Sequence, residues 1–370
     1  MGKEKEINKR NTFLQAFSKL IIGICGLAVM PSAVLCALSP FINPSKFVWS
    51  ALFGLGFWVI FIANIIILVI LLFFKARRTL LIPILTLLIL VPGFCKSYAF
   101  GEKKDVESQL KVMTYNVQVF GYYDGVENVT KEKQSLADLI KKHNPDVICL
   151  QESGEWPNNK ALNFSKMIGY KYFSFNPDNG NSYFSKYPIQ NPKEYKDGKI
   201  DNFIDIKKIV IDKNKSFYLI NCHLNSFKIS SEELEYIHDA KNIVKDSELY
   251  GKSLISKLSN GFKLRTKSTE TLLRNLPNDD IPFVICGDFN DTPLSYTYNQ
   301  IEKTGLNDAF ITLSKGIGKT YCGPLPLLRI DYFWYNDKVE AVDYERIKYA
   351  ASDHYPLIMT FNIKKEVEEE

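Results

Sequence analysis

Acidic, amide and histidine side chains follow or precede several short apolar runs of this sequence. Asp288 and Asn290 come just after the run Phe283–Cys286 and the glycine at 287. The same arrangement recurs at other positions, namely Asn116, Glu152, His223 with Asn225, Asp331, and Asp353 with His354. Carboxylate and amide oxygens bind hard divalent cations, and a histidine beside a carboxylate moves protons. Together these residue types can perform metal-dependent hydrolysis of a phosphoester.

Each of these side chains has a role that fits its chemistry. Glu152, helped by Asn116 and Asp353, offers oxygen ligands that suit Mg²⁺ or Mn²⁺ rather than zinc. Such an ion neutralises phosphate oxygens and stabilises the charge that develops in the transition state. Asp288 is expected to act as the base or to position the water for in-line attack on phosphorus. Asn290 is expected to hydrogen-bond that water or a phosphoryl oxygen.

A histidine–carboxylate pair completes the expected catalytic set. His354 paired with Asp331 can be held protonated, so that it stabilises the pentavalent phosphorus centre or assists the leaving oxygen. Asn225 and Arg329 lie next to the other candidates in the sequence and are expected to contact the substrate.

Taken singly, these residues also have ordinary structural explanations. A Gly-Asp pair after a strand is a common turn, and an aspartate within a strand can simply pair with a nearby arginine. The ordinary explanation is a solvated strand end for Glu152, a turn for Asn116, a hydrogen-bonded core histidine for His223, an ion pair with Arg329 for Asp331, and a plain loop for Asp353–His354. One shared site explains six such positions more simply than six coincidences.

From about residue 110 the sequence alternates between strand-like and helix-like segments, which are the elements that must position these residues. The expected strands are 111–118, 146–152, 170–175, 203–211, 217–223, 283–286, 329–335 and 355–363, with a helix at 130–142 and a polar, mostly helical excursion at 226–276. In enzymes built on such sheets, ligands bind where the strands end. The candidates lie at those ends, except Asp331, which is expected within a strand.

The first hundred residues have a different character. Three long apolar runs, at about 20–39, 47–74 and 79–95, carry charges only between them, and we expect three transmembrane helices. A cleaved signal peptide is an alternative for the first run, although its apolar stretch exceeds the usual length of about 7–15 residues. Basic residues in the N-terminal segment and at Lys75–Arg78 place both in the cytoplasm. We therefore expect an integral protein of a bacterial cytoplasmic membrane, with its N-terminus inside and its catalytic domain outside.

The distribution of charge bears on the class of substrate. Residues 1–100 carry a net charge of +8, whereas residues 101–370 carry a net charge of −3. The second part has no overall basic excess for gripping a polyanion, which disfavours a basic nucleic-acid-binding protein. The expected organisation is a membrane anchor at 1–100, a linker at 101–109, a catalytic domain at 110–365 and an acidic tail at 366–370.

The motifs, in this order, resemble those of the endonuclease/exonuclease/phosphatase superfamily, which includes deoxyribonuclease I, abasic-site endonucleases, neutral sphingomyelinases and inositol polyphosphate 5-phosphatases. The six blocks that carry the resemblance span the chain from residue 110 to 365: Thr114–Asn116, Leu150–Glu152, Asn221–Leu224, Gly287–Asp291, Arg329–Tyr332 and Ser352–His354. The segment Ser182–Ile189 also looks like a strand of that family.

The resemblance implies a fold and one further catalytic residue. It implies an α/β fold, a four-layer α/β sandwich of two packed mixed β-sheets flanked by helices, with the site at one end. It also implies that His223 contacts phosphate, as the corresponding histidine does in the nuclease- and sphingomyelinase-like members. Abasic-site enzymes carry a different residue there.

A shared site does not choose among the substrates of such a family. Membrane attachment, an outward-facing site and a mildly acidic domain favour a lipid or a small phosphodiester as the substrate. An endonuclease acting on nucleic acid outside the cytoplasm is the alternative. A catalytically inactive, membrane-tethered binding module is a third possibility, and it should have lost residues that this chain retains.

Overall fold

The computed structural model forms two compact units. One comprises Met1–Lys96 and Pro293–Asn299, and the other comprises Ser97–Thr292 and Gln300–Glu370. The residues that the structure describes are 12, 16, 17, 20, 23, 28–73, 79–120, 129–154, 160–195, 199–227, 247–323, 325, 327–349 and 351–364. The expected acidic tail at 366–370 lies outside them.

The described elements of the first unit are all helical, and most of them are built from long apolar runs. Its described elements are α2 (Met30–Leu38), the short 3₁₀ helix η2 (Ser39–Phe41), α3 (Val48–Leu55), α4 (Phe57–Phe73) and α5 (Leu81–Ser97). Its small buried core contains Ala33, Cys36, Phe57, Leu90 and Leu294.

These helices differ from the three spanning helices that the sequence predicts. The predicted span 47–74 is divided at Gly56, whose lack of a Cβ makes it a poor helix former, into α3 and α4, which meet at a bend of 63°. Only this bent pair has the length and composition to cross a membrane, and no single helix among the described residues does. The predicted span 20–39 falls partly outside the described residues, and 79–95 corresponds to the 17-residue α5. The prediction of three transmembrane helices is therefore not supported.

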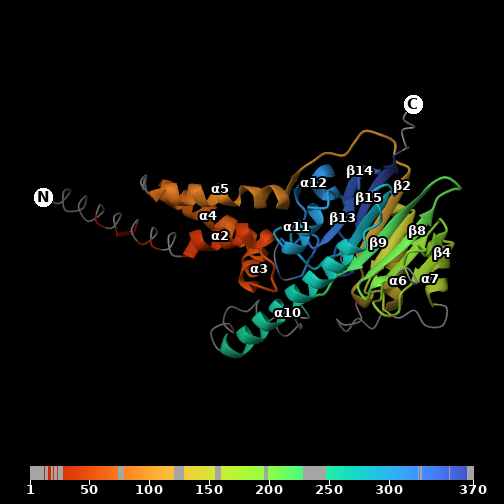
Figure 1. The fold of residues 1–370 in the computed structure, drawn as a ribbon, viewed down its shortest axis with the longest axis horizontal. Coiled ribbons are helices and arrows are strands. Elements are labelled where there is room, and N and C mark those ends of the chain that lie inside the picture. The colour runs from red at the N-terminus through yellow and green to blue at the C-terminus, as the bar shows by residue number, and fades with distance from the viewer. Residues whose placement is uncertain are drawn as a thin grey trace. The chain divides into compact units, whose positions relative to one another are not determined.

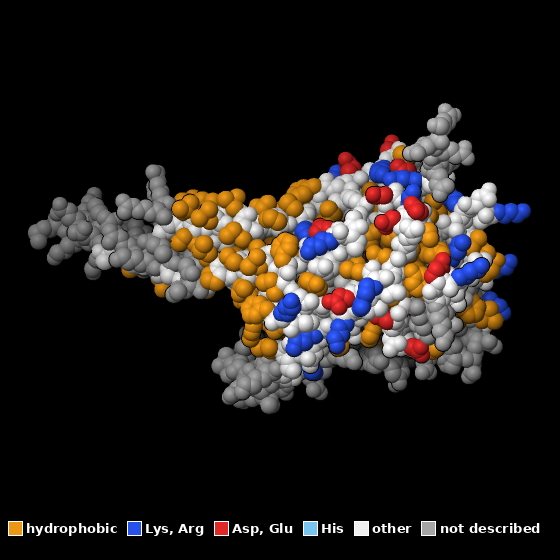
Figure 2. Space-filling model, in the orientation of Figure 1, with side chains coloured by type: hydrophobic (Ala, Val, Ile, Leu, Met, Phe, Trp, Pro, Cys, Tyr) orange, Lys and Arg blue, Asp and Glu red, His pale blue; other side chains and the backbone are white. Residues whose placement is uncertain are grey.

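Many apolar side chains of α4 and α5 are exposed. Val59 is 65% exposed and Phe73 80% exposed on α4, while Leu81 and Leu88 on α5 are 62% and 60% exposed. Figure 2 shows hydrophobic side chains gathered over these helices. Single exposed apolar residues are ordinary, whereas a continuous apolar surface marks an interaction site.

The second unit contains two mixed sheets, as predicted. The first sheet has the strand order β14-β15-β2-β3-β5-β4, and the second has the order β11-β13-β10-β9-β8-β6 with β7 paired to β8. The strands of the first sheet are β2 (Leu110–Asn116), β3 (Val147–Gln151), β4 (Tyr172–Phe175), β5 (Ser182–Ser185), β14 (Val339–Arg346) and β15 (Leu357–Ile363). Those of the second are β6 (Ile189–Gln190), β7 (Lys199–Asp201), β8 (Ile204–Val210), β9 (Ser216–His223), β10 (Phe283–Asp288), β11 (Asn307–Asp308) and β13 (Asp331–Tyr335).

Helices flank the two sheets (Figure 1). On one side, α6 (Val129–His143) and α7 (Lys160–Ile168) bury Leu136, Ile140 and Phe164 against the first sheet. Between the sheets, alternate residues such as Val112, Val147, Leu219, Val284 and Phe333 form the main core. The remaining elements are α10 (Ser247–Arg274), α11 (Tyr296–Glu302), α12 (Ala309–Leu313) and a small ribbon of β1 (Tyr98–Phe100) and β12 (Lys315–Ile317).

Strand direction brings the candidate residues to one edge. β2 and β3 are parallel, with Asn116 opposite Gln151, and β9 and β10 are parallel, with His223 opposite Asp288. β13 runs antiparallel to β10, so its first residue, Asp331, lies opposite Asp288. Asp331 therefore begins its strand, and does not lie within it as the sequence predicts. β15 is antiparallel to β2, so the residues that precede it reach the same edge.

Candidate active site

Asn116 links the two sheets at this edge. Its Nδ2 donates to Oε1 of Glu152 at 3.1 Å, across the first sheet, and to Oδ2 of Asp288 at 3.0 Å, on the second sheet. Asn116 is only 2% exposed. One amide group therefore sets the separation between two of the predicted functional carboxylates.

The turns that follow β2 and β3 are held in uncommon backbone conformations. Glu152 has a φ of +50°, and Gln118, Val119 and Phe120 also have positive φ angles. The Gln118 amide donates to Oδ1 of Asn116 at 3.0 Å, and the Val119 amide donates to the carbonyl of Glu152 at 2.8 Å. Left-handed non-glycine residues are costly and concentrate at functional sites. These hydrogen bonds stabilise the turns that aim Asn116 and Glu152.

Gly287 is required by the close approach of β10 to β9. Its φ is +129°, and a Cβ at this position would lie 2.0 Å from the carbonyl oxygen of Cys222. Only glycine tolerates that conformation and that contact. The approach places Asp288 directly beside His223.

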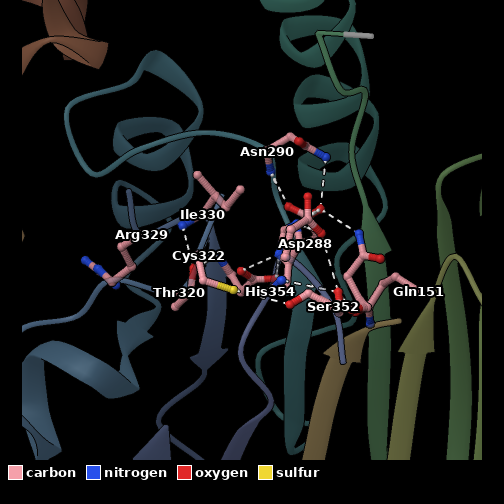
Figure 3. Close-up of polar contacts among 12 residues, drawn as sticks. Gln151, Asp288, Asn290, Thr320, Cys322, Arg329, Ile330, Ser352 and His354 are labelled. Carbon is pink, nitrogen blue, oxygen red and sulfur yellow. Dashed lines mark hydrogen bonds and ion pairs between the residues drawn. The ribbon is translucent and has the colours of Figure 1, made fainter. Parts of the chain in front are cut away.

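Asp288 is buried, with 1% exposure, and its carboxylate accepts several hydrogen bonds. Oδ1 accepts from the backbone amide of Asn290 at 2.8 Å, and Oδ2 accepts from its side-chain Nδ2 at 3.1 Å. Burial raises the pKa of Asp288 to about 6, against the opposing effect of His354. Figure 3 shows the Asn290 and His354 side chains directed at Asp288. A carboxylate of this kind is ionised at neutral pH and still basic enough to take a proton from water.

His354 lies between two aspartates. Its Nδ1 is 2.9 Å and 3.0 Å from the two carboxylate oxygens of Asp331, and its Nε2 is 3.7 Å from Oδ2 of Asp288. Burial alone would lower the pKa of His354, but the two carboxylates raise it well above its usual value. Thr320 fixes the start of β13, because its Oγ1 accepts from the backbone amides of Ile330 and Asp331 at 3.0 and 3.1 Å. The two carboxylates therefore favour the imidazolium form of His354.

Glu152 forms an ion pair with His223, with Nε2 of His223 3.2 Å from Oε1 of Glu152. Burial alone would raise the pKa of Glu152, but His223 and Asn116 lower it to about 2. Burial would likewise lower the pKa of His223, and the carboxylate of Glu152 raises it. The Glu152 side chain remains 30% exposed, so a permanently ionised oxygen donor faces solvent.

Asp353 stands at the open side of the site, with its side chain 31% exposed and its Oδ1 3.9 Å from Nε2 of His354. Burial raises the pKa of Asp353. Its neighbour Ser352 donates from Oγ to the backbone carbonyl of Asn116 at 2.8 Å and accepts from the His354 amide at 3.2 Å. Ser352 thus ties this loop to the end of β2.

Two sets of residues in the described part of the chain have the types of side chain that hold a cation, and the first is also closely spaced. Asp288, Asp331 and His354 have ligand atoms within 4.8 Å of one another. However, Nδ1 of His354 is engaged by Asp331, and the ring is held protonated, which suits proton transfer better than metal binding. Glu152, which is hydrogen-bonded to Asn116, and Asp353 offer partly exposed carboxylate oxygens, the ligand type that Mg²⁺ and Mn²⁺ prefer.

The structure does not bring Arg329 into this group. Its side chain is 3% exposed, and its Nη1 lies 2.6 Å from Oδ2 of Asp308. It also stacks on the rings of Phe310 and Tyr332, and in Figure 3 it points away from Asp288. The predicted substrate contact of Arg329 is therefore corrected to a buried ion pair. The alternative Asp331–Arg329 pair is also wrong, because Asp331 binds His354.

Asn225 lies beyond the end of β9 and contacts α10. Its Oδ1 accepts from Oγ of Ser268 at 3.1 Å, and its backbone carbonyl accepts from Nη1 of Arg265 at 2.8 Å. Its side chain therefore already has a protein partner. A contact with substrate stays a prediction.

Three polar residues beneath the site lie in the motifs identified from the sequence, which assigned them no role. Nε2 of Gln151 donates to Oγ1 of Thr114 at 3.0 Å and to Oδ1 of Asn221 at 2.6 Å, which joins the two sheets a second time. Nδ2 of Asn221 in turn donates to the carbonyl of Leu150 at 3.1 Å. Besides their place in these motifs, the sequence signal is that polar residues occupy buried strand positions, which are costly without partners.

The chain matches a profile described as "Endonuclease/Exonuclease/phosphatase family" over residues 113–354. A second profile, described as a domain of unknown function, matches residues 18–97. A curated relative is the "CCR4-Not complex 3'-5'-exoribonuclease subunit Ccr4" of Emericella nidulans, 24% identical over 233 residues that cover 50% of this chain and 34% of that protein. The chain thus matches about a third of the length of this relative.

The human Nocturnin catalytic domain with bound sulfate is one similar solved structure, with a sequence identity of 19% and a TM-score of 0.49. The match covers 70% of this chain and 94% of that chain. An AP endonuclease from Archaeoglobus fulgidus has 16% identity, covers 69% of this chain and all of its own, and has a TM-score of 0.46. The profile match alone covers well over half of the sequence and includes every motif residue from Thr114 to His354. The chain therefore belongs to the endonuclease/exonuclease/phosphatase family and is a hydrolase of that nuclease- and phosphatase-like group.

Proposed function

We propose that this protein is a divalent-metal-dependent phosphodiesterase that hydrolyses its substrate by in-line attack of water. The observation that carries the proposal is the row formed by Asp331, His354 and Asp288, which combines a protonated histidine with a basic carboxylate. Glu152 and Asn116 lie beside this row and supply oxygen donors. General acid–base groups next to anionic ligands are what phosphoester hydrolysis requires.

In the proposed reaction Asp288 takes the proton from the attacking water as its oxygen forms a bond to phosphorus. The pKa of Asp288, about 6, leaves it ionised and able to do so at neutral pH. Asn290 holds that carboxylate through its backbone amide and its Nδ2. The Oδ1 of Asn290 is the acceptor that we assign to orienting the attacking water.

The bond from phosphorus to the leaving oxygen breaks on the opposite side. His354, protonated and oriented by Asp331, stabilises the negative charge that accumulates on the phosphoryl oxygens or donates its proton to the leaving oxygen. His223, held by Glu152, is a second cationic donor for a phosphoryl oxygen. A Mg²⁺ or Mn²⁺ ion held by Glu152, Asn116 and Asp353 would add neutralisation of phosphate charge.

For the substrate we propose a lipid or small phosphodiester at an extracytoplasmic membrane surface. Support comes from the exposed apolar side chains of α4 and α5, which suit contact with acyl chains, and from the basic residues of the N-terminal segment. The net charge of −3 over residues 101–370 also disfavours a long polyanion. Membrane anchorage with the catalytic unit outside the cytoplasm is part of this proposal.

A nuclease is the second candidate, and one observation favours it. The curated relative from Emericella nidulans is named as an exoribonuclease subunit, although the match covers only 34% of that protein. Nuclease activity would need a local basic surface despite the overall charge.

The test is an assay of the full-length chain in detergent micelles or vesicles with Mg²⁺ or Mn²⁺. Substrates are sphingomyelin-type and glycerophospholipid vesicles, inositol phosphates, RNA and plasmid DNA, each with an EDTA control and with His354→Ala as the inactive control. Chelator-sensitive cleavage of lipid or small phosphodiesters supports the first proposal, and preferential cleavage of RNA or DNA supports the second. Hydrolysis that survives EDTA, or equal hydrolysis by His354→Ala, contradicts the mechanism. No turnover on any substrate favours a binding module.

A further inference from the structure

Arg265 on α10 is completely buried, with an exposure of 0%, although arginine is normally found at the surface. Its Nη1 donates to the backbone carbonyl of Asn225 at 2.8 Å. Its Nε forms an ion pair with Oδ2 of Asp291 at 3.4 Å, and the Asp291 side chain is 6% exposed. One guanidinium thus contacts two loops of the second sheet.

The surroundings of Arg265 hold the guanidinium in place. It lies over the rings of Phe227, at 4.0 Å, and Phe262, at 4.9 Å from the ring centroids. α10 approaches Phe227 closely at Gly261, where a Cβ would come within 2.6 Å of a Phe227 ring carbon. A planar guanidinium fits such stacked, forked contacts in a way that a lysine ammonium does not.

The two loops that Arg265 contacts are those that leave the paired strands β9 and β10. Asn225 is two residues after His223, and Asp291 directly follows Asn290. Strand pairing ends at His223 and Asp288. Beyond it, the Leu224 amide donates to the carbonyl of Asp288 at 2.9 Å, and Nδ2 of Asn290 donates to the carbonyl of Leu224 at 2.9 Å. Arg265 adds a third link, from a different element.

We propose that Arg265 is a positioning residue for the proposed hydrolysis: through Asn225 and Asp291 it fixes the two loops that carry His223 and Asn290. The inference rests on the proposed function, because its role is to keep those groups aligned. At 0% exposure Arg265 itself does not touch the substrate. A displacement of about 1 Å in catalytic groups can cost roughly 100-fold in rate, even when the mutated residue is remote.

Loss of any buried arginine destabilises a fold, so a matched control is needed. Arg329 is also buried, with 3% exposure, pairs with Asp308 on β11 and stacks on the rings of Phe310 and Tyr332. Its ion pair is not with the loops after β9 and β10, and its contact with the second of these loops runs through Tyr332, whose hydroxyl donates to the carbonyl of Asp291 at 2.8 Å. Arg329→Met therefore removes a buried arginine–aspartate pair of the same kind. It is expected to lower the melting temperature about as much as Arg265→Met does.

The kinetic test compares Arg265→Met, Arg265→Lys, Asp291→Asn and Arg329→Met in the full-length chain, with bis(p-nitrophenyl) phosphate and Mn²⁺ as the probe. We expect Arg265→Met to lower kcat about 100-fold with KM within about threefold, because alignment and not substrate contact is lost. Arg265→Lys should recover part of that loss, and Asp291→Asn should share it. Arg329→Met should keep kcat within about threefold. Equal losses in Arg265→Met and Arg329→Met would reduce Arg265 to a structural residue.

A second measurement does not depend on turnover. Hydrogen–deuterium exchange of the full-length chain should speed up at residues 223–227 and 288–292 in Arg265→Met, and not in Arg329→Met. Unchanged exchange in both segments would overturn the inference whatever the activity. Faster exchange in Arg265→Met, combined with a wild-type protein that hydrolyses no phosphoester, would uphold the linkage and refute the proposed function instead.

Discussion

Replacing Asp331 by asparagine tests the charge relationship at the centre of the site. Asp331→Asn keeps the size of the side chain but removes the negative charge that lies 2.9 and 3.0 Å from Nδ1 of His354. The backbone amide of residue 331 still donates to Thr320, so the start of β13 should be preserved. The perturbation is therefore chiefly electrostatic.

The size of the effect follows from the geometry. Two unit charges about 3 Å apart interact by roughly 5 kcal/mol at an effective dielectric constant of about 20. One pKa unit corresponds to about 1.4 kcal/mol, so a quarter of that interaction shifts the pKa of His354 by about one unit. Because the pKa of His354 is raised in the wild type, the ring is fully protonated below the ordinary pKa of a histidine. It loses its proton only as the pH rises through the raised pKa. In Asp331→Asn that loss should begin at lower pH.

The assay is the pH dependence of kcat for the wild type and Asp331→Asn with one phosphodiester and a fixed metal concentration. We expect the alkaline limb to move down by at least about one unit and kcat at its optimum to fall by about 10²–10⁴-fold, since an asparagine also permits the wrong imidazole tautomer. Thermal unfolding serves as the control for folding. An alkaline limb at the wild-type position, or a kcat within about threefold of wild type, would refute the proposed role of the pair.

Three further predictions concern the neighbouring residues. Asp288→Asn should lower kcat by at least about 10³-fold while a thermal melt shows a folded protein, because the amide cannot accept the proton of water; substantial turnover would exclude Asp288 as the base. Glu152→Gln should weaken Mn²⁺ binding by at least about tenfold in calorimetry. Glu152→Gln should also remove the contribution of Glu152 to the acid sensitivity of the free energy of unfolding. The pKa of Glu152 is lowered to about 2, so its stabilising effect is present above its ordinary pKa of about 4.3 and is lost as pH falls toward 2. Equal acid unfolding of both proteins would contradict this. Gly287→Ala should destabilise the fold by about 3 kcal/mol or more, because its Cβ would lie 2.0 Å from the Cys222 carbonyl oxygen, and a wild-type denaturation midpoint would contradict that contact.

Much of the second unit was predictable because polar residues terminate apolar strands. The expected helix at 130–142 is α6 (Val129–His143), and the expected strand at 217–223 is β9 (Ser216–His223). Asn116, Asp288 and His354 meet because parallel and antiparallel neighbours share one edge, which follows from the strand pattern once the sheet order is known. Their roles in catalysis remain predictions.

Other features depend on contacts that no local pattern encodes. Arg329 was expected at the site because it precedes Asp331 by two residues, yet β13 begins only at Asp331, and the partner of Arg329, Asp308, lies on β11. The second apolar run appeared continuous by hydropathy, but Gly56 bends it by 63°. Arg265 lay within a polar stretch, where burial could not be foreseen.

The bond between Asn116 and Asp288 joins residues that are 172 positions apart, and Ser352 closes a contact with Asn116 over 236 positions. Contacts of such high sequence separation form late, because loop-closure entropy must be overcome before they can stabilise the chain. During synthesis on the ribosome, the early residues of the site are therefore made long before the residues that they contact. Catalytic competence should be the last property gained on refolding, after each sheet has already formed its own hydrogen bonds.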